Sequence, residues 1–343
     1  MRRKLANLCL AAATALSPAA AAAESLVFGT GNVVIHPINE RIMTPWAKQI
    51  NATSDGAVEI AVRHGQMLVN GGNYVDRVQD DVVQIAFGML VFDPGRFPRS
   101  LVSTVPFIEG SAEASSLAFC RLYEAGAFDA ELANFKPLFF VPFPQSSAHL
   151  NGGPLTSMSD LEGKKIMVGS PTASQIVSAF GGTPLSIILP EQYQALQRST
   201  ADGNFMTYTA FPAFNLQEVT TDHLRVPLGG ATGMVFMDRA RFEALPEEAK
   251  AVLESNSGCD KTREVGAEVD DWEAESLAFV AEQDGHTINE IDPAEFEAMR
   301  AELGEEIFAS FAERAPEGEA LLAQWRQAME DARREIGEIG EIE

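Results

Sequence analysis

The sequence predicts an α/β protein of two lobes, with parallel-rich mixed sheets and long helices that brace them. Strand and helix patterns alternate twice, first before residue 90 and again from about residue 136. After Asp238 the pattern becomes almost wholly helical and rich in glutamate. The 343 residues also exceed what one hydrophobic core usually serves, which favours two domains.

The first residues have the parts of a cleavable secretion signal. A basic start at Arg2, Arg3 and Lys4 precedes an apolar run, and the run ends in alanines that close at Ala23. The apolar run is too short to span a bilayer. We therefore expect a signal peptide over residues 1–23, a periplasmic location and no membrane insertion of the mature chain.

The first α/β unit begins with an apolar strand in SLVFGTGN. An amphipathic helix follows, because apolar residues recur at four-residue spacing; these are Ile38, Ile42, Trp46 and Ile50. The remaining elements are expected in AVEIAVRHG (strand), around Tyr74, Val75 and Val78 (helix) and in VVQIAFG (strand). This order is typical of a parallel sheet covered by helices.

The second unit repeats the pattern. Strands are expected in PLFFVPF, KKIMVG, PLSII and NFMTYTAF, and helices in TASQIVSAF and PEQYQALQRS. Long helices follow in ARFEALPEEAKAVLESNSG, around Trp272 and in EALLAQWRQAMEDARREI. We expect lobe I to comprise residues 24–145 plus about 228–265, and lobe II residues 146–227 plus about 266–343. A ligand cleft is expected between the lobes.

Charge and cysteine content restrict the partners. A net charge of −24 argues against nucleic acid and anionic membrane surfaces. Two cysteines lie beyond the signal, Cys120 and Cys259. An exported protein permits a disulfide between them, but two buried free thiols fit the sequence equally well.

Catalytic and cofactor motifs are missing. The sequence contains no G-x-S-x-G, H-E-x-x-H, P-loop or C-x-x-C motif. Gly29 and Gly31 follow a strand, but Val34 stands where a dinucleotide-binding loop needs its third glycine. The five histidines show no spacing of metal ligands. We therefore expect no enzyme activity, no cofactor and no metal. His36 lies at a strand-to-helix junction and is a candidate to line the cleft.

Several ordered motifs resemble one family. They are HP after the first strand, GQML, DDVVQIAFG, TVPFIEG, PLTSMSDLEGKKIMV, GGTPLSI, EQYQALQRSTADG and LPEEAKAVLE. Together they resemble the periplasmic solute-binding proteins of tripartite ATP-independent periplasmic (TRAP) transporters, the DctP family, over nearly the whole mature chain. The resemblance implies a type II periplasmic-binding-protein-like clamp that captures a small organic solute by hinge closure and delivers it to membrane permease subunits.

The resemblance also implies an unusual ligand site. The family usually has arginine after the KI of DLKGKKI, where it binds a ligand carboxylate through two hydrogen bonds, and here that residue is Met167. A second family arginine matches Ser147, and an assisting asparagine matches Met206. All three positions are neutral here, so an apolar or atypical organic ligand is favoured over a simple dicarboxylate.

Other positions match ligand-facing sites of the family and are mostly apolar, although Met and Phe residues of this kind also occur in cores. With the positions above they complete the predicted site: Gly31, Asn32, His36, Phe87, Gly88, Met89, Phe92, Gly169, Ser170, Ile187 and Leu189.

Three alternatives remain open. A carboxylate could use another anchor; the candidates are Arg63, His64, Arg96, Arg99, His36 and the backbone N–H groups of the helix that starts near Ser170. The protein could serve a sensor kinase instead of a permease, or it could be an exported enzyme on a similar fold. We expect a monomer.

Overall fold

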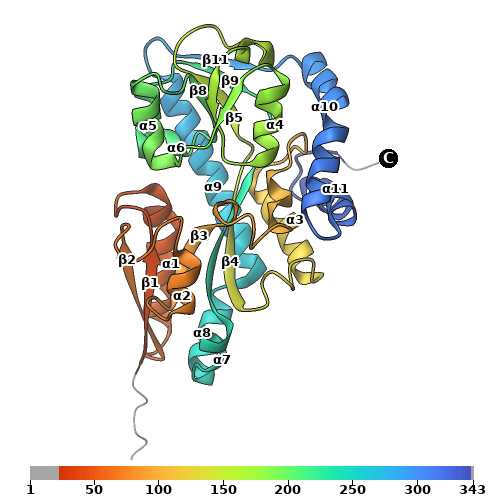
Figure 1. The fold of residues 1–343 in the computed structure, drawn as a ribbon. Helices are drawn as coiled ribbons and strands as arrows, with labels where there is room; N and C mark the ends of the chain where they lie inside the picture. The colour runs from red at the N-terminus through yellow and green to blue at the C-terminus, as the bar shows by residue number, and fades with distance from the viewer. Residues whose placement is uncertain (1–22, 341–343) are drawn as a thin grey trace, which may run out of the picture.

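The computed structural model describes residues 23–340, which form two lobes, each built around one β-sheet (Figure 1). One sheet has the strand order β2-β1-β3-β10-β4, and the other has the order β11-β9-β5-β8-β6-β7. The predicted two-lobe α/β fold is therefore confirmed. The predicted signal peptide, apart from Ala23, lies outside the described residues.

The first sheet is mixed. It contains the parallel strands β1 (Glu24–Thr30), β2 (Val58–His64) and β3 (Ile85–Met89), followed by β10 (Ala231–Asp238), which is antiparallel to both β3 and β4 (Phe135–Phe143). Its helices are η1 (Asn39–Met43), α1 (Thr44–Thr53), α2 (Tyr74–Gln79), η2 (Leu90–Phe92), η3 (Ser100–Thr104) and α3 (Ala112–Glu124).

The second sheet has short strands. They are β5 (Ser147–Leu150), β6 (Lys165–Met167), β7 (Thr183–Leu185), β8 (Gly203–Met206), β9 (Asp222–Arg225) and β11 (Thr287–Glu290). The helices around it are η4 (Met158–Leu161), α4 (Pro171–Ala179), α5 (Leu189–Gln197), α6 (Ala210–Phe214) and η5 (Leu216–Glu218). Strands β6, β7 and β8 are parallel, so they end at one edge.

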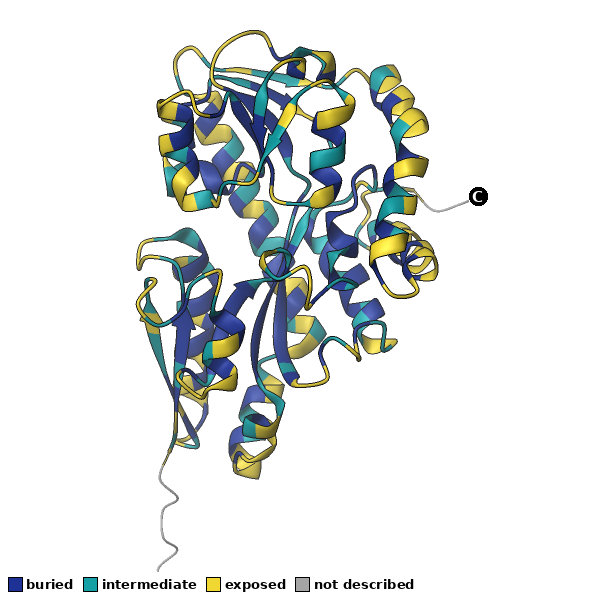
Figure 2. Cartoon of the chain, viewed as in Figure 1, coloured by how far each residue is buried: buried dark blue, intermediate teal, exposed yellow. Residues whose placement is uncertain are grey.

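Each sheet separates two hydrophobic cores, because side chains alternate between its faces. In β1, Leu26 and Phe28 pack on one core while Val27 packs on the other. In β8, Phe205 and Met206 divide between the two cores of the second lobe in the same way. Figure 2 shows the result, with buried strands in dark blue behind helices whose outer faces are exposed.

Five helices lie in the C-terminal part of the chain. They are α7 (Arg239–Glu243), α8 (Glu247–Ser255), α9 (Gly258–Ala281), α10 (Pro293–Arg314) and α11 (Gly318–Glu335). Among them, α7 and α8 pack on the first lobe alone. Helix α9 runs through the middle of the molecule (Figure 1), with Val265 in a core of the first lobe and Val280 in a core of the second.

The lobe boundaries near the C-terminus stay a prediction, but packing favours a change to them. Phe296 and Ile307 of α10 belong to a core of the second lobe, as the predicted division has it. Leu321 and Trp325 of α11 instead belong to a core of the first lobe, where α11 lies against α3. We therefore favour counting α11 with the first lobe, although its position in the sequence follows α10 directly.

Two carboxylates of α9 bind one lobe each. Asp270 accepts hydrogen bonds from the backbone N–H groups of Ala112 and Glu113, at 2.7 and 2.8 Å, and so caps α3 in the first lobe. One turn later, Glu273 accepts from the N–H groups of Tyr208 and Thr209, at 2.9 and 2.7 Å, in the second lobe. The helix therefore holds both lobes through hydrogen bonds from backbone N–H groups to its two carboxyl groups.

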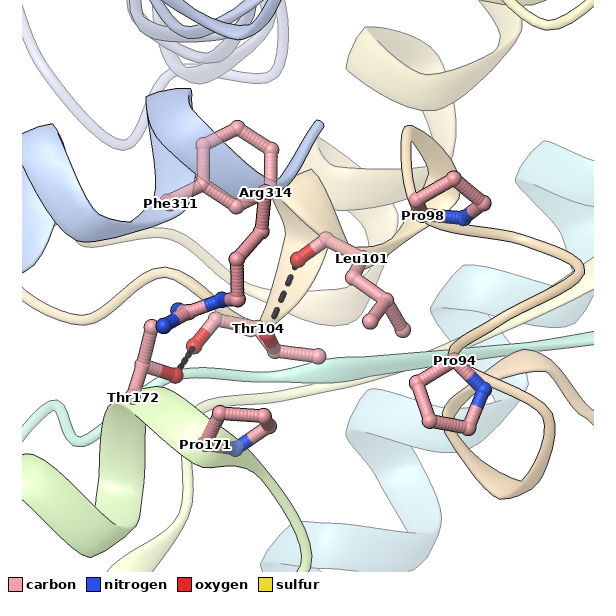
Figure 3. Close-up of a pocket in the computed structure, with 8 residues that line it drawn as sticks. All are labelled: Pro94, Pro98, Leu101, Thr104, Pro171, Thr172, Phe311 and Arg314. Atoms are coloured by element: carbon pink, nitrogen blue, oxygen red, sulfur yellow. Dashed lines mark hydrogen bonds between the residues drawn. The ribbon is translucent and has the colours of Figure 1, made fainter. Parts of the chain in front are cut away.

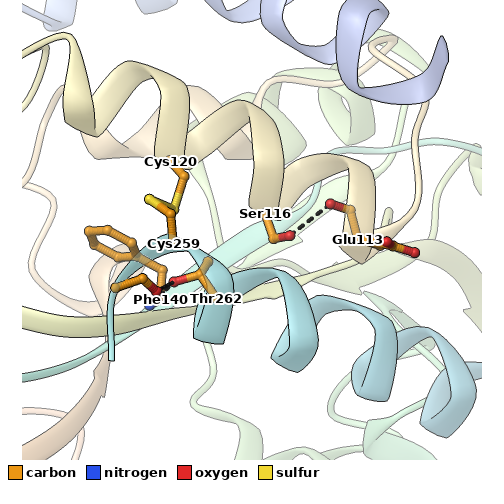
Figure 4. The surroundings of a disulfide bond; sticks show 7 residues. Glu113, Ser116, Cys120, Phe140, Cys259 and Thr262 are labelled. Atoms are coloured by element: carbon orange, nitrogen blue, oxygen red, sulfur yellow. Dashed lines mark hydrogen bonds between the residues drawn. A yellow bond between two sulfur atoms is a disulfide. The ribbon is translucent and has the colours of Figure 1, made fainter. Parts of the chain in front are cut away.

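A disulfide between Cys120 and Cys259 ties α3 to the start of α9, with the two Cα atoms 5.7 Å apart (Figure 4). It resolves the alternative that the sequence left open. Nearby, Thr262 accepts a hydrogen bond from the N–H of Phe140 at 3.0 Å, which joins α9 to β4 (Figure 4). The bridge closes a long loop, because 139 residues separate the two cysteines, and it constrains the unfolded chain accordingly.

Two chain segments cross directly between the sheets, residues 144–146 from β4 to β5 and residues 226–230 from β9 to β10. Gly229 lies in the second segment with a φ of +97°. A Cβ atom there would lie 2.2 Å from the carbonyl oxygen of Thr104. The N–H of Gly229 donates to Oε1 of Gln145 at 2.8 Å, so the two crossing segments are bonded to each other.

The strand predicted over NFMTYTAF is shorter than expected, and this part of the prediction was wrong. Strand β8 ends at Met206, and Ala210–Phe214 form helix α6. Glu273 binds the backbone N–H groups of Tyr208 and Thr209, so these groups are not available for pairing in the sheet.

Candidate functional site

The carboxyl ends of the parallel strands lie at sheet edges that face each other. Strand β4 ends at Phe143, and β5 begins only four residues later at Ser147. In the second sheet, Ser147 is paired with Met206, the last residue of β8. In the first sheet, β4 has the same direction as β1 and β3 because β10 is antiparallel to both neighbours. The predicted site residues therefore belong to two adjoining edges.

The turn after β1 is fixed by a buried asparagine. Nδ2 of Asn39 donates to the carbonyl oxygens of Asn32 and Val33, at 3.1 and 2.7 Å. Its Oδ1 accepts from the hydroxyl of Thr30 at 2.8 Å. This network holds the turn, and Gly31 and Asn32 are half-buried within it.

His36 lies among aromatic rings from both lobes. Its ring centroid is 5.4 Å from that of Phe214 in α6 and 6.0 Å from that of Trp272 in α9, and Trp272 in turn lies 6.2 Å from Phe143. All three contacts are edge-on, the favourable geometry for rings. We call these four residues the aromatic cluster.

The protonation of His36 follows from its contacts. Burial lowers the pKa of its imidazole to about 4, so the ring is neutral near pH 7. Nδ1 accepts the N–H of Ile38 at 3.2 Å, which places the remaining proton on Nε2. Nε2 has no hydrogen-bond partner among the described residues and is not a buried atom. His36 therefore presents an unused N–H donor.

At the end of β3, some of the predicted site residues are buried by packing and others keep exposed surface. Gly88 is required by packing, because a Cβ atom there would lie 2.1 Å from the ring of Tyr74. Phe87 is buried in a core of the first lobe. Met89 is half-buried, and Phe92 is 49% exposed beside Gly71. Only Met89 and Phe92 of this group therefore offer surface to a ligand in this conformation.

The register of the second sheet brings together the three positions where the family resemblance implies charged or amide residues. Ser147 is opposite Met206, and Met167 is opposite Asn204, two residues before Met206 on the same strand. The three side chains belong to one face of the sheet. They differ in exposure: Met206 is half-buried, whereas Ser147 is buried and Met167 has 0% exposed surface.

The loops after β6 and β7 are the more open part of this lobe. Gly169 is exposed, and a Cβ atom there would meet nothing within 4 Å. The hydroxyl of Ser170 accepts from the N–H of Ala173 at 3.1 Å and caps α4. Ile187 and Leu189 are half-buried.

Exposed apolar side chains surround both edges, and the sequence reasoning did not select them. They are Val33, Val34 and Ile35 after β1, Met67 after β2 and Ile188 after β7. Met67 is the most exposed of them at 91%. An apolar run such as VVI directly after a strand, where a loop would be polar, is the signal that could have identified part of this group.

Two of the arginines considered as alternative anchors for a ligand carboxylate, Arg96 and Arg99, are already bonded to other groups of the chain. Arg96 pairs with Asp93 at 2.8 Å and with Asp76 at 3.7 Å. Arg99 binds the carbonyl oxygens of Ala127 and Pro316 and pairs with Glu317 at 3.5 Å.

At the end of β2, Arg63 is exposed and His64 is half-buried. Nδ1 of His64 is buried without a hydrogen-bond partner among the described residues. Of the side chains proposed as alternative anchors, His36 is therefore the one that combines a free N–H donor with a place among residues from both lobes.

Three histidines form a hydrogen-bonded chain behind Met206. Nε2 of His149 bonds to the carbonyl oxygen of Met206 at 3.0 Å, Nδ1 of His149 to Nδ1 of His223 at 2.8 Å, and Nε2 of His223 to Nδ1 of His286 at 3.0 Å. A carbonyl only accepts, so His149 donates through Nε2, and each following ring must donate through Nδ1. Burial lowers the pKa of His149 to about 4 and that of His223 to about 2, so these two rings stay neutral.

A small cavity of about 70 Å³ lies where the two lobes touch (Figure 3). Thr104 from the first lobe and Pro171 and Thr172 from α4 are among its lining residues. The hydroxyl of Thr172 donates to the carbonyl oxygen of Thr104 at 3.0 Å, a buried hydrogen bond between the lobes (Figure 3). None of the predicted site residues lines this cavity.

Within residues 23–340, no group of three or more His, Cys, Asp or Glu side chains is arranged to hold a metal ion. None of the helices in the same range is long and apolar enough to cross a membrane.

Residues 28–314 match the family of bacterial extracellular solute-binding proteins, family 7 (DctP). The chain belongs to this family. The match covers most of the chain, and it confirms the resemblance and the prediction of a solute-binding protein rather than an enzyme. One relative is described as outer membrane transporter protein TsaT of Comamonas testosteroni. The two sequences are 25% identical over 74% of this chain and 76% of the relative's length.

Solved structures have the same fold. A TRAP solute-binding protein from a marine metagenome, in complex with 3-hydroxybenzoate, matches with a TM-score of 0.85 and 24% identity, over 91% of this chain and 99% of its own. A TRAP solute-binding protein from Rhodoferax ferrireducens T118, in complex with benzoate, matches with a TM-score of 0.84 and 21% identity, over 91% of this chain and 99% of its own. A TRAP solute-binding protein from Bordetella bronchiseptica, with bound mandelate, matches with a TM-score of 0.79 and 24% identity, over 90% of this chain and 99% of its own.

Proposed function

We propose that this family 7 protein captures an aromatic carboxylic acid between its lobes in the periplasm and delivers it to the membrane subunits of a TRAP transporter. The aromatic cluster carries the proposal, because His36, Phe143, Phe214 and Trp272 come from both lobes and from α9. Three related structures contain aromatic acids, which supports the same ligand class here.

The surroundings of the cluster favour an apolar ligand body. Met89, Met206 and Phe92 keep accessible surface at the two edges, and the exposed group of Val33, Val34 and Ile35 follows β1. Flat rings contribute binding free energy through buried area and edge-to-face contacts, about 0.5–1.5 kcal/mol per aromatic pair beyond burial. A polar dicarboxylate would leave this surface unused.

The carboxylate needs donors other than arginine at position 167. His36 supplies an N–H through Nε2, and the open backbone at Gly169 and Ser170 lies at the start of α4, where free N–H groups favour anions. We propose that these groups replace the two-pronged arginine contact, with Asn32 and Ser147 as further polar neighbours.

A thermal-shift screen followed by calorimetry tests the proposal. The mature protein is measured with benzoate, 3-hydroxybenzoate and mandelate, and in parallel with succinate and malate. A ligand at 100 times its dissociation constant adds about 2.7 kcal/mol to the free energy of unfolding. We expect this stabilisation with aromatic acids. Tight binding of succinate or malate without binding of any aromatic acid would contradict the proposal.

Variants of His36 separate the anchor from packing. His36→Gln keeps a side-chain N–H donor and should retain more affinity for benzoate than His36→Phe, which keeps the ring but has no donor. Loss of a hydrogen bond to a charged group costs about 1.5–3 kcal/mol. Glu40→Gln, at an exposed position four residues on, is the matched control and should bind like the unchanged protein.

A second ligand class, neutral aromatic molecules, is favoured by the absence of charge at Met167, Ser147 and Met206. Benzamide in the same screen distinguishes the two classes. Binding of benzamide as tight as that of benzoate would show that the site recognises the ring and not the carboxylate.

The permease and the compartment need separate experiments. Adjacent genes for two membrane permease subunits would support transport, and an adjacent histidine kinase gene would support sensing. Mass analysis of the exported protein would show whether the chain is cut after residue 23, as the signal pattern predicts.

A further inference from the structure

The exposed apolar side chains gather at the two sheet edges that carry the candidate site. Among residues 23–340, eight large apolar side chains are exposed. Val82 and Phe279 lie elsewhere. The other six lie in segments directly after β1, β2, β3 and β7; they are Val33, Val34, Ile35, Met67, Phe92 and Ile188. A single exposed apolar residue is ordinary on a protein surface, whereas a gathered group marks an interaction surface.

Two apolar segments of this group belong to opposite lobes. We call residues 33–35 the β1 rim and residues 187–189 the β7 rim. The β1 rim directly precedes His36, whose ring lies 5.4 Å from that of Phe214 in α6. The β7 rim leads into α5, which packs against α6. Figure 1 shows α5 and α6 above the loops at the ends of β1 and β2. The two rims therefore lie on the same side of the interlobe site.

The β1 rim is a fixed turn, although its corner residues are apolar. The N–H of His36 donates to the carbonyl oxygen of Val33 at 3.0 Å, which makes Val34 and Ile35 the corner residues of a β-turn. The buried side chain of Asn39 donates to the same carbonyl oxygen at 2.7 Å. Turn corners usually hold glycine, proline or short polar residues. Here the fixed turn instead presents two branched apolar side chains to solvent, with Ile35 76% exposed.

Buried amides hold the β7 rim in a similar way. Nε2 of Gln192 donates to the carbonyl oxygen of Ile187 at 3.2 Å, and Oε1 of Gln192 accepts from Nδ2 of Asn204 at 2.9 Å. Both amide residues are buried. Ile188 follows the bonded carbonyl group and is 61% exposed. Because both rims present their side chains from a fixed backbone, little conformational entropy is lost when they meet.

Neither rim carries a charge. No Asp, Glu, Lys or Arg occurs in residues 29–39 or in residues 183–190, although 22% of the chain is charged. The 49 acidic residues outnumber the 25 basic ones, so closing two ordinary surfaces of this protein would bring carboxylates together. Like charges at such a contact repel. The rims are therefore suited to contact each other.

We propose that the β1 rim and the β7 rim close on each other when a ligand is bound between the lobes, with Val34 and Ile35 packing against Ile188. Lobe closure alone does not require this contact, because the ligand could bridge the lobes without it. The contact removes apolar surface from water and covers the ligand, which then leaves only after the rims separate. The rims thereby act as a clasp that sets how long the ligand stays bound. The proposal rests on ligand capture between the lobes, which is part of the proposed function, but it does not require an aromatic ligand.

Disulfide trapping tests the contact directly. The rim pair combines Val34→Cys with Ile188→Cys in the mature protein, whose own two cysteines are already joined. The control pair combines Val82→Cys with Ile188→Cys, because Val82 is also exposed but precedes β3, at the opposite edge of the first sheet. Under mild oxidation without ligand, the rim pair should form an intramolecular disulfide at least about ten-fold faster than the control pair, since a closed state is sampled even by the free protein. Benzoate should increase this rate further. Equal rates for the two pairs would overturn the proposal.

Dissociation kinetics test what the clasp does. Val34→Ser and Ile188→Ser should each raise the dissociation rate constant of bound benzoate by about five- to ten-fold, with little change in the association rate constant. Either substitution breaks the same contact, so the double variant should release benzoate at most about two-fold faster than the faster single variant. Val82→Ser is the matched control and should behave like the unchanged protein. Unchanged dissociation in both single variants, or effects that multiply fully in the double variant, would contradict the clasp.

Other occupants of the rims would give different results. Disulfide-linked dimers that form faster from Val34→Cys alone than from Val82→Cys alone would show that the β1 rim joins two copies of the chain. Normal release of benzoate from the serine variants, with loss of its uptake by cells that carry them, would show that the rims contact a permease. Either result overturns the clasp. If no acid of the screen binds, the proposed function fails, and the trapping rates of the two cysteine pairs still decide whether the rims meet.

Discussion

Met167 shows how one side chain separates fold from ligand choice. It has 0% exposed surface and packs in the same core as Leu196, Tyr208 and Phe211. The family resemblance implies a charged residue there, and this chain fills the place with an unbranched apolar one that suits irregular packing. The neutral position fits a site that recognises apolar surface.

Met167→Arg should therefore destabilise the protein. An unpaired charge in a core typically costs about 3–5 kcal/mol, so we expect the free energy of unfolding, measured in urea, to fall by about that amount. Met167→Leu, which conserves volume, should cost less than about 1.5 kcal/mol. A fully stable Met167→Arg protein that gains succinate binding would show that the side chain reaches the ligand after all.

Glu273 links stability to pH. Burial raises the pKa of its carboxyl to about 7, although the N–H groups of Tyr208 and Thr209 favour the charged form. The unfolded chain has the ordinary, lower pKa, so the stabilisation from this group is complete at low pH and is lost as the pH rises towards 7 and above. Glu273 is thus a weak point of the α9 connection in neutral solution.

The Glu273→Gln variant removes this dependence. The free energy of unfolding of the unchanged protein, relative to the variant, should fall by about 3 kcal/mol between pH 4.5 and pH 8. Urea titrations across this range measure the difference. Glu264→Gln, at an exposed site on α9, serves as the control and should run parallel to the unchanged protein. A difference between the unchanged protein and Glu273→Gln that is independent of pH would contradict the assignment.

At the scale of elements, the histidine chain joins strands that sequence alone did not reveal. His149 is in β5, His223 is in β9, and His286 directly precedes β11. The pKa values of His149 and His223 are lowered by burial, so their contribution to stability is present above about pH 6.5 and is lost as the pH falls below it. The second sheet should therefore be sensitive to acid.

A His149→Leu variant tests this expectation. It should be less stable at pH 7.5, because the carbonyl of Met206 and the ring of His223 lose a partner, but it should lose less stability than the unchanged protein between pH 6.5 and pH 4.5. Each bound proton changes the free energy by about 1.4 kcal/mol per pH unit. Equal acid dependence of both proteins, followed by circular dichroism, would contradict the role of the chain.

The elements best predicted from sequence were those with strong periodicity. The stripe of Ile42, Trp46 and Ile50 gave α1, and the apolar runs gave β1, β3 and β4. Strands β5, β9 and β11 have four residues each, too few to show a period against their surroundings. Strand β10 was missed although residues 233–237, GMVFM, form an apolar run like those of β1, β3 and β4, so its local signal was present and was not used.

The sequence predicted where the site residues lie in the fold better than it predicted which of their side chains are exposed. The resemblance pointed to strand ends, and the register brings Ser147, Met167 and Met206 onto one face of the second sheet. It did not show that Met167 is covered, nor that Phe214 and Trp272 stand beside His36. Those facts depend on how α6 and α9 pack between the lobes, which is set by tertiary contacts.

At the scale of the whole molecule, the two crossing segments, residues 144–146 and 226–230, are where we expect the chain to bend when the angle between the lobes changes. Gly229 has a φ of +97° and a close approach to the carbonyl oxygen of Thr104, and only glycine adopts this conformation without strain. The other connections, α9 and the pair α10 and α11, are helices with buried faces. Changes of interlobe angle are therefore expected to concentrate in residues 144–146 and 226–230.

Gly229→Ala should destabilise the protein by about 1–3 kcal/mol and shift the distribution of interlobe angles, because the new methyl group must displace Thr104. Urea unfolding and small-angle X-ray scattering measure the two effects. Gly95→Ala is the matched control, since a Cβ atom at Gly95 would meet nothing within 4 Å. Unchanged stability and scattering in Gly229→Ala would show that the segment adapts freely.

Helix α9 also fixes the orientation of one lobe relative to the other, because Asp270 and Glu273 bind different lobes from the same helix. An α-helix advances about 100° per residue. One residue inserted between these two carboxylates would turn the second lobe by that angle about the helix, or break one of the two attachments. The number of residues between the attachments thus sets the rotational phase of the lobes, and single insertions or deletions there should be far more damaging than substitutions.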